Sequence, residues 1–97
     1  MKYDRLHFFS DSGHGWLRVP LQDVQLAMLQ GLKLTTYSYQ DDKYAYLEED
    51  LDAPEWINFR QIPKEIQHQW KTTKGSGYSS IRNKYRLKLI ELTESGN

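Results

Sequence analysis

The chain has 97 residues, of which 38% are hydrophobic and 27% charged, so its length fits one compact domain and excludes two. It has no cysteine, which excludes disulfide frameworks, thiolate metal sites and a cysteine nucleophile. No apolar run is long enough to span a membrane, and the first residues lack the pattern of a signal peptide. We therefore expect a cytoplasmic protein that does not bind membranes.

The formal net charge is zero, from 13 basic and 13 acidic residues, but the two signs are separated along the chain. Residues 1–58 contain 5 Lys or Arg against 10 Asp or Glu, whereas residues 59–97 contain 8 against 3. Acidic residues are densest in 41–55 and basic residues in 71–88. This separation predicts two candidate binding surfaces of opposite charge.

The first half of the chain predicts two hairpins and a helix. The aromatic segment 3–9 and the segment 16–19 flank a glycine-containing turn, which predicts a β-hairpin. Residues 20–31 repeat apolar side chains at helical spacing, which predicts an amphipathic helix. Residues 32–39 and 44–48 alternate with period two and predict a second hairpin.

The second half predicts a helix and an edge strand. Asp52 can cap a helix that begins there, since a glutamate follows three residues later. Residues 71–80 have the composition of a flexible loop, and 93–97 are expected to fray. Residues 85–89 alternate again and predict a fifth strand at a sheet edge, protected by its basic side chains.

These elements predict a single α+β domain over residues 1–97. Its two β-hairpins would form a four- or five-stranded antiparallel sheet, with two helices packed on one face. The sequence leaves open whether the protein is a monomer or a homodimer. The predicted core consists of Leu6, Phe8, Leu17, Val19, Leu21, Val24, Met28, Leu34, Tyr46, Trp56 and Phe59.

The loop before Trp16 contains the side chains of a hydrolytic site. Asp11, Ser12 and His14 supply a carboxylate, a hydroxyl and an imidazole, but neighbours in one loop do not establish that these groups converge in space. The three histidines lack the spacing of metal ligands, and no phosphate or dinucleotide motif is present. We predict no enzyme, no metal and no cofactor, and keep a small hydrolase as the last of three hypotheses.

Three ordered motifs carry a family resemblance: GHGWLRVP at 13–20, YSYQDDKYAYLEEDLDAP at 37–54 and SSIRNKYR at 79–86. Together they resemble a family of small proteins carried by phages, plasmids and other mobile elements. The resemblance implies a mobile-element context, in which short cytoplasmic proteins often bind a host protein and disable or redirect it. It implies no reaction. The matched positions are Gly13, His14, Gly15, Trp16, Tyr37, Tyr39, Tyr46, Leu47, Glu48, Glu49, Asp50, Asp52, Arg82 and Asn83.

The first functional hypothesis is therefore a non-enzymatic phage or mobile-element accessory protein that acts in the cytoplasm of the host cell. It would bind a host protein, such as a defence nuclease or another nucleic-acid-processing enzyme, and inhibit it through an acidic and aromatic surface. Carboxylates would provide charge complementarity and aromatic rings would provide anchors. The residues predicted for this surface are Trp16, Tyr37, Tyr39, Glu48, Glu49, Asp50 and Asp52.

The alternative is a small nucleic-acid-binding module in the basic C-terminal segment. Basic side chains would follow phosphates while aromatic rings stack on bases. The sequence pI of about 6.8 is lower than that of a dedicated nucleic-acid binder. The residues predicted for this module are Trp70, Lys71, Lys74, Tyr78, Arg82, Lys84 and Arg86.

Overall fold

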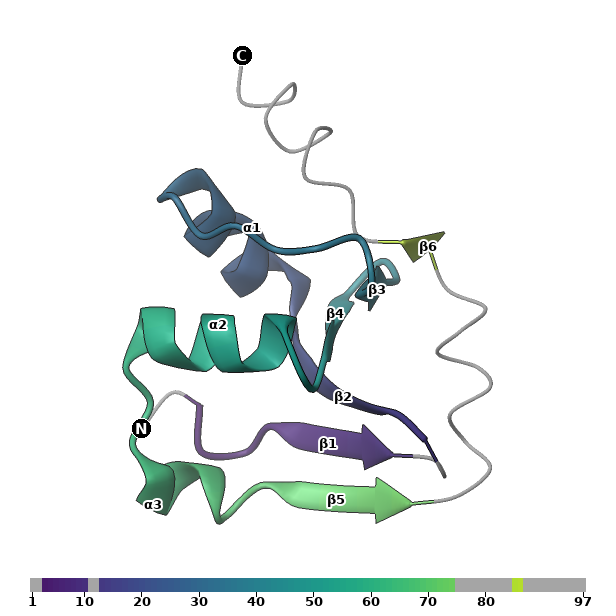
Figure 1. The fold of residues 1–97 in the computed structure, drawn as a ribbon. Coiled ribbons are helices and arrows are strands. Elements are labelled where there is room, and N and C mark those ends of the chain that lie inside the picture. The colour runs from purple at the N-terminus through teal and green to yellow at the C-terminus, as the bar shows by residue number, and fades with distance from the viewer. Residues whose placement is uncertain (1–2, 11–12, 75–84, 87–97) are drawn as a thin grey trace.

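A computed structural model of the chain describes residues 3–10, 13–74 and 85–86 and shows an α+β fold, as predicted (Figure 1). Along the chain, pairs of consecutive strands are separated by helices. The elements are β1 (His7–Ser10), β2 (Gly15–Pro20), α1 (Leu21–Leu29), β3 (Tyr39–Gln40), β4 (Tyr44–Glu48), α2 (Asp52–Arg60), α3 (Lys64–Gln67), β5 (Lys71–Lys74) and β6 (Tyr85–Arg86).

The strands form one sheet in the order β5-β1-β2-β4-β3-β6. The two predicted hairpins are present as the antiparallel pairs β1–β2 and β3–β4. The sheet is mostly antiparallel, as predicted, but β5 runs parallel to β1, with His7 opposite Lys71 and Ser10 opposite Lys74. This parallel pair follows from the route of the chain, which returns to the sheet edge through α2 and α3 (Figure 1).

The main core lies between one face of the sheet and the helices. In the central strands Leu17 stands opposite Leu47 and Val19 opposite Ala45, so their side chains share the face on which α1 and α2 pack. Trp56 of α2 is fully buried in this core. The other buried members are Val24, Ala27, Leu32, Leu34, Ala53 and Ile62.

The opposite face of the sheet is aromatic. Trp16, Tyr39 and Tyr46 form a second buried cluster, against which Phe9 and Tyr44 pack. The guanidinium carbon of Arg18 lies 4.6 Å from the ring centroid of Tyr44 and 5.3 Å from that of Phe9. Rings and a cation thus cover the face to which the core helices do not contribute.

Several predicted elements need correction. Residues 32–38 are not a strand, because Leu32 and Leu34 are buried in an irregular segment and β3 begins only at Tyr39. Residues 71–74 are not a loop, because they form β5, whereas 75–80 and 93–97 lie outside the described residues. Of the predicted edge strand, Tyr85–Arg86 is present as β6, paired with β3.

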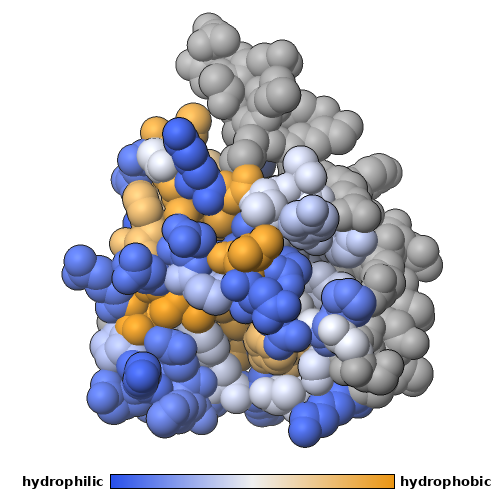
Figure 2. All heavy atoms as spheres, in the orientation of Figure 1, coloured by the Kyte–Doolittle hydropathy of each residue, from blue (hydrophilic) through white to orange (hydrophobic). Residues whose placement is uncertain are grey.

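The predicted core is largely present. Six of its members are buried, and Leu6, Phe8, Leu21 and Met28 pack against them with part of their surface in solvent. Phe59 was wrongly predicted, because it is 37% exposed near the C-terminal end of α2. Apolar side chains also gather over α1 on the face shown in Figure 2, and the exposed leucines of this helix are Leu26 and Leu29.

In the part of the chain that the structure describes, none of the helices has the length and apolar character that a membrane span requires.

Candidate functional site

A pocket of about 500 Å³ lies where β2 begins and β4 ends. It joins parts of the chain that are distant in sequence: the end of the β1–β2 loop, β2, the segment leading into β3, β4 and the turn before α2. Five of the seven residues predicted for partner binding line it. We call it the acidic–aromatic pocket; its lining residues are Gly13, His14, Trp16, Tyr37, Tyr39, Glu48, Asp50 and Leu51.

The floor of this pocket is built from packed rings. Trp16 and Tyr39 are only 2% and 8% exposed, and their ring centroids lie 6.4 Å apart. The imidazole of His14 stacks near Trp16, with 6.0 Å between centroids and 18° between ring planes. Trp16 and Tyr39 thus form the floor of the pocket, and their role as anchors for a partner stays a prediction.

The rim of the pocket is more accessible. Tyr37 is 59% exposed and Leu51 is 48% exposed, and the side chains of His14 and Asp50 are exposed as well. The Tyr37 backbone N–H donates to the Thr35 hydroxyl at 3.2 Å, which fixes the main chain beneath the ring. Sequence reasoning missed Leu51 as a site residue, although an apolar side chain within an acidic run was the available signal.

The two carboxylates of the pocket have different surroundings. Glu48 accepts hydrogen bonds from the backbone N–H groups of Asp50 at 3.0 Å and Leu51 at 2.8 Å, so its oxygens hold the turn that leads into α2. Among the described residues, the Asp50 carboxylate accepts no hydrogen bond and forms no ion pair. Asp50 is thus the acid of the pocket that is available to a ligand.

Asp52 lies in the interior, so its predicted role in a partner-binding surface is wrong. It is 1% exposed, and it accepts hydrogen bonds from the Thr35 backbone N–H at 2.9 Å and the Thr35 hydroxyl at 2.7 Å. The buried hydroxyl of Ser38 also donates to Asp52, and it accepts a hydrogen bond from the Glu48 backbone N–H at 3.0 Å. This polar cluster ties the segment that carries Tyr37 to the start of α2.

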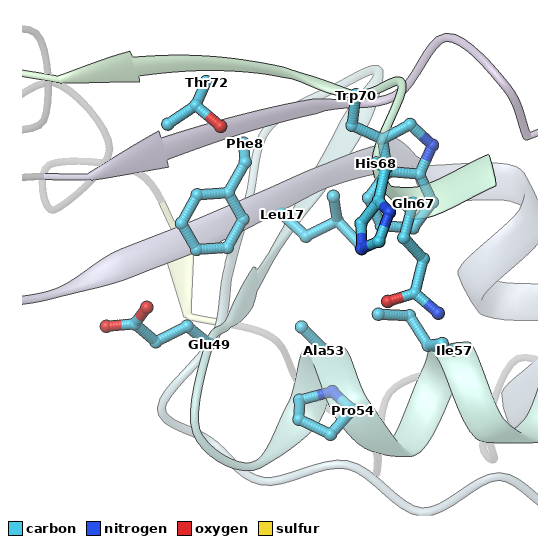
Figure 3. Close-up of a pocket in the computed structure, with 10 residues that line it drawn as sticks. All are labelled: Phe8, Leu17, Glu49, Ala53, Pro54, Ile57, Gln67, His68, Trp70 and Thr72. Carbon is cyan, nitrogen blue, oxygen red and sulfur yellow. The ribbon is translucent and has the colours of Figure 1, made fainter. Parts of the chain in front are cut away.

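Glu49 belongs to the other side of the sheet, because successive residues of a strand alternate between faces. It lines a second pocket, of about 300 Å³, between the sheet and α2 (Figure 3). Figure 3 shows Glu49 beside Phe8 at one end of this pocket and Gln67, His68 and Trp70 at the other. The remaining lining residues are Leu17, Ala53, Pro54, Ile57 and Thr72.

The residues predicted for nucleic-acid binding are not brought together within the described part of the chain. The Trp70 indole N–H donates to the Tyr3 carbonyl at 2.6 Å and the ring lines the second pocket, so Trp70 supports the fold. Lys71 and Lys74 are exposed on β5, at one edge of the sheet, whereas Arg86 belongs to β6 at the opposite edge. Tyr78, Arg82 and Lys84 lie outside the described residues.

The described residues do not bring together the three side chains of the hydrolase hypothesis. His14 lies on the pocket rim, while Asp11 and Ser12 are outside the described residues. In the segments that the structure describes, no group of three or more His, Asp or Glu side chains could hold a metal ion. His7 is held in β1 with its Nε2 atom 2.6 Å from the Thr73 hydroxyl, and burial lowers its pKa, with Arg18 and Lys71 adding to the effect.

Comparison of the chain with protein-family models, with curated proteins and with solved structures finds no match.

Proposed function

We propose that the protein is a non-enzymatic binding protein that docks onto a partner protein through the acidic–aromatic pocket. One observation carries the proposal: residues from three separate stretches of the chain meet in a single hollow, with Tyr37 and Leu51 exposed beside the Asp50 carboxylate. Tyrosine is among the residues enriched at the energetic centres of protein interfaces.

The rigidity of the pocket favours binding. Its floor is packed, and its walls are joined by the hydrogen bonds of Glu48 and Asp52. A preformed surface loses less conformational entropy on association than a flexible one. The rim side chains of Tyr37 and Leu51 are then the principal groups that a partner must order.

The partner we propose is a host protein, with the chain acting as an accessory protein of a phage or another mobile element. The GHGW, YSY and YLEED motifs support this context by resemblance, and the pocket contains residues of all three. A defence nuclease or another nucleic-acid-processing enzyme has basic surfaces that complement the carboxylates at 48 and 50. Occupying such a surface would inhibit the enzyme in the host cytoplasm.

The test is a pull-down of the tagged protein from host lysate after nuclease treatment, followed by calorimetry with the retained protein. We expect one stoichiometric partner, and we expect the Y37A/L51A double variant to weaken binding by more than about tenfold, as loss of central interface residues does. L26A is the matched control, because Leu26 is 49% exposed on α1, outside the pocket lining.

Two outcomes contradict the proposal. Equal binding by Y37A/L51A and by the wild type would exclude this pocket as the docking surface. Retention that disappears on nuclease treatment would instead favour the nucleic-acid alternative, whose exposed basic residues in the described chain include Lys71 and Lys74.

A further inference from the structure

The chemistry of the acidic–aromatic pocket is that of a site for an organic cation. Two carboxylates, the rings of Trp16, Tyr37 and Tyr39 and the imidazole of His14 line it, and its described lining contains no Lys or Arg. Carboxylates attract a cation through charge, and ring faces attract it through their quadrupole. Within this described lining, an anionic ligand would meet Glu48 and Asp50 without a compensating Lys or Arg.

The carboxylates of Glu48 and Asp50 would have different roles in binding a cation. Glu48 already accepts two backbone hydrogen bonds from the turn that it stabilises. Neither carboxylate oxygen of Asp50 accepts a hydrogen bond from a described residue. Asp50 is exposed and lies on the rim beside Tyr37 and Leu51. A cation in the pocket would therefore bind Asp50 directly and interact with Glu48 through longer-range charge.

We propose that the pocket takes the guanidinium group of an arginine side chain presented by the partner, an inference that rests on the proposed function. A planar guanidinium can lie on a tyrosine ring while its paired N–H groups donate to one carboxylate, whereas a lysine ammonium is a compact, strongly hydrated charge. The aliphatic part of the arginine would pack on Leu51 at the rim.

The protein contains an internal example of this packing. On the aromatic face of the sheet, the Arg18 guanidinium lies against the rings of Phe9 and Tyr44, at 5.3 and 4.6 Å from their centroids. Trp16, in the pocket floor, belongs to the same aromatic face. The proposed arginine would extend this pattern to the end of the sheet and would also bind the Asp50 carboxylate.

The test uses capped Gly-Gly-X-Gly-Gly peptides, with arginine, lysine or citrulline at X, titrated into the ¹⁵N-labelled full chain. Citrulline has nearly the shape of arginine but no charge. We expect the arginine peptide to give saturable amide shifts confined to residues 13–16, 37–39 and 48–51, the lysine peptide to bind at least about threefold more weakly, and the citrulline peptide to give no saturable shifts.

Variants assign the effect to one carboxylate. D50N keeps the size of the side chain and should weaken arginine-peptide binding by about fivefold or more, as loss of a charge-assisted hydrogen bond does. E55Q neutralises another exposed acid, on α2 outside the pocket lining, and should leave the affinity unchanged. The amide spectrum of each variant reports directly that it is folded.

The inference is overturned if the arginine peptide gives no saturable shifts, if shifts fall elsewhere, if lysine or citrulline binds as well as arginine, or if D50N binds like the wild type. These failures are separate from failure of the proposed function. A partner captured through Tyr37 and Leu51 that binds without any arginine contact would refute this inference alone. A pocket that binds the arginine peptide while no host protein is retained would refute the proposed function alone.

Discussion

The Asp52 carboxylate accepts a hydrogen bond from the Ser38 hydroxyl, and both side chains are almost completely buried. The same carboxylate accepts two hydrogen bonds from Thr35. Because these residues precede β3 while Asp52 begins α2, the bonds join the two segments that carry Tyr37 and Leu51. The shape of the acidic–aromatic pocket therefore depends on a polar cluster that lies outside the pocket lining.

Substitution of Asp52 tests this dependence. D52A leaves the buried Ser38 hydroxyl and the Thr35 groups without their acceptor, so we expect it to lower the unfolding free energy by about 3 kcal/mol. Urea denaturation followed by circular dichroism measures the change. The exposed first-turn acid Glu55 provides the control, and E55A should cost less than about 0.5 kcal/mol. Equal stability of D52A and E55A would contradict the structural role of Asp52.

The acidic run shows why the sequence could suggest the site but could not predict which of the acids line it. The four acids of this run look alike in the sequence but lie in different places. Glu48 is in the pocket wall and Asp50 on its rim, whereas Glu49 is on the opposite sheet face and Asp52 is in the core. Alternation along β4 explains the separation of Glu48 and Glu49. The burial of Asp52 depends on donors 14 and 17 residues earlier in the chain, which no local pattern reveals.

The same limit applies to the fold. Period-two alternation correctly predicted β4, because this central strand buries one face against the helices. In 32–38 alternation reflects buried Leu32 and Leu34 in an irregular segment, where the Thr35 backbone N–H binds Asp52 instead of a neighbouring strand. Strand β5 had no apolar pattern to detect, since all four of its side chains are exposed and its pairing with β1 is non-local.

The two acids at 48 and 50 should differ in their effects on stability. E48A removes the acceptor of the Asp50 and Leu51 backbone N–H groups, so we expect a loss of about 1 kcal/mol, similar to loss of a helix cap. D50A removes an exposed side chain that accepts no described hydrogen bond and should change stability by less than about 0.5 kcal/mol. Thermal and urea unfolding of both variants measure the difference. A larger loss for D50A would reverse the assigned roles.

Gly15 is required by close packing at the start of β2. A Cβ atom added there would lie 2.6 Å from Cζ of Phe8 and 2.8 Å from Oε2 of Glu49. We therefore expect G15A to destabilise the protein by about 1–3 kcal/mol through overpacking. Gly13 is the matched control, because a Cβ atom there would meet nothing within 4 Å. Chemical denaturation should separate the two variants, and similar stabilities would show that Phe8 and Glu49 move aside without cost.

Ionisation of Tyr46 is expected to lower the unfolding free energy at alkaline pH. Burial raises the pKa of Tyr46 to about 12, and the hydrogen bond from its hydroxyl to Asp41, at 3.0 Å, adds to the rise. In the unfolded chain a tyrosine ionises near pH 10. The folded state holds the Tyr46 proton more tightly than the unfolded state does. The stability that the protonated hydroxyl contributes is therefore complete below pH 10 and is lost as the pH rises through about 12.

We therefore expect the unfolding free energy to fall between about pH 10 and 12, with Tyr46 accounting for up to roughly 2–3 kcal/mol of that fall. Urea unfolding followed by circular dichroism at a series of pH values measures the slope. Y46F lacks the ionising hydroxyl and should show a shallower slope, although it starts from lower stability because it loses the bond to Asp41. Y37F removes a hydroxyl from a ring that is 59% exposed and should keep the wild-type slope. Parallel curves for Y46F and the wild type would show that another group causes the alkaline loss.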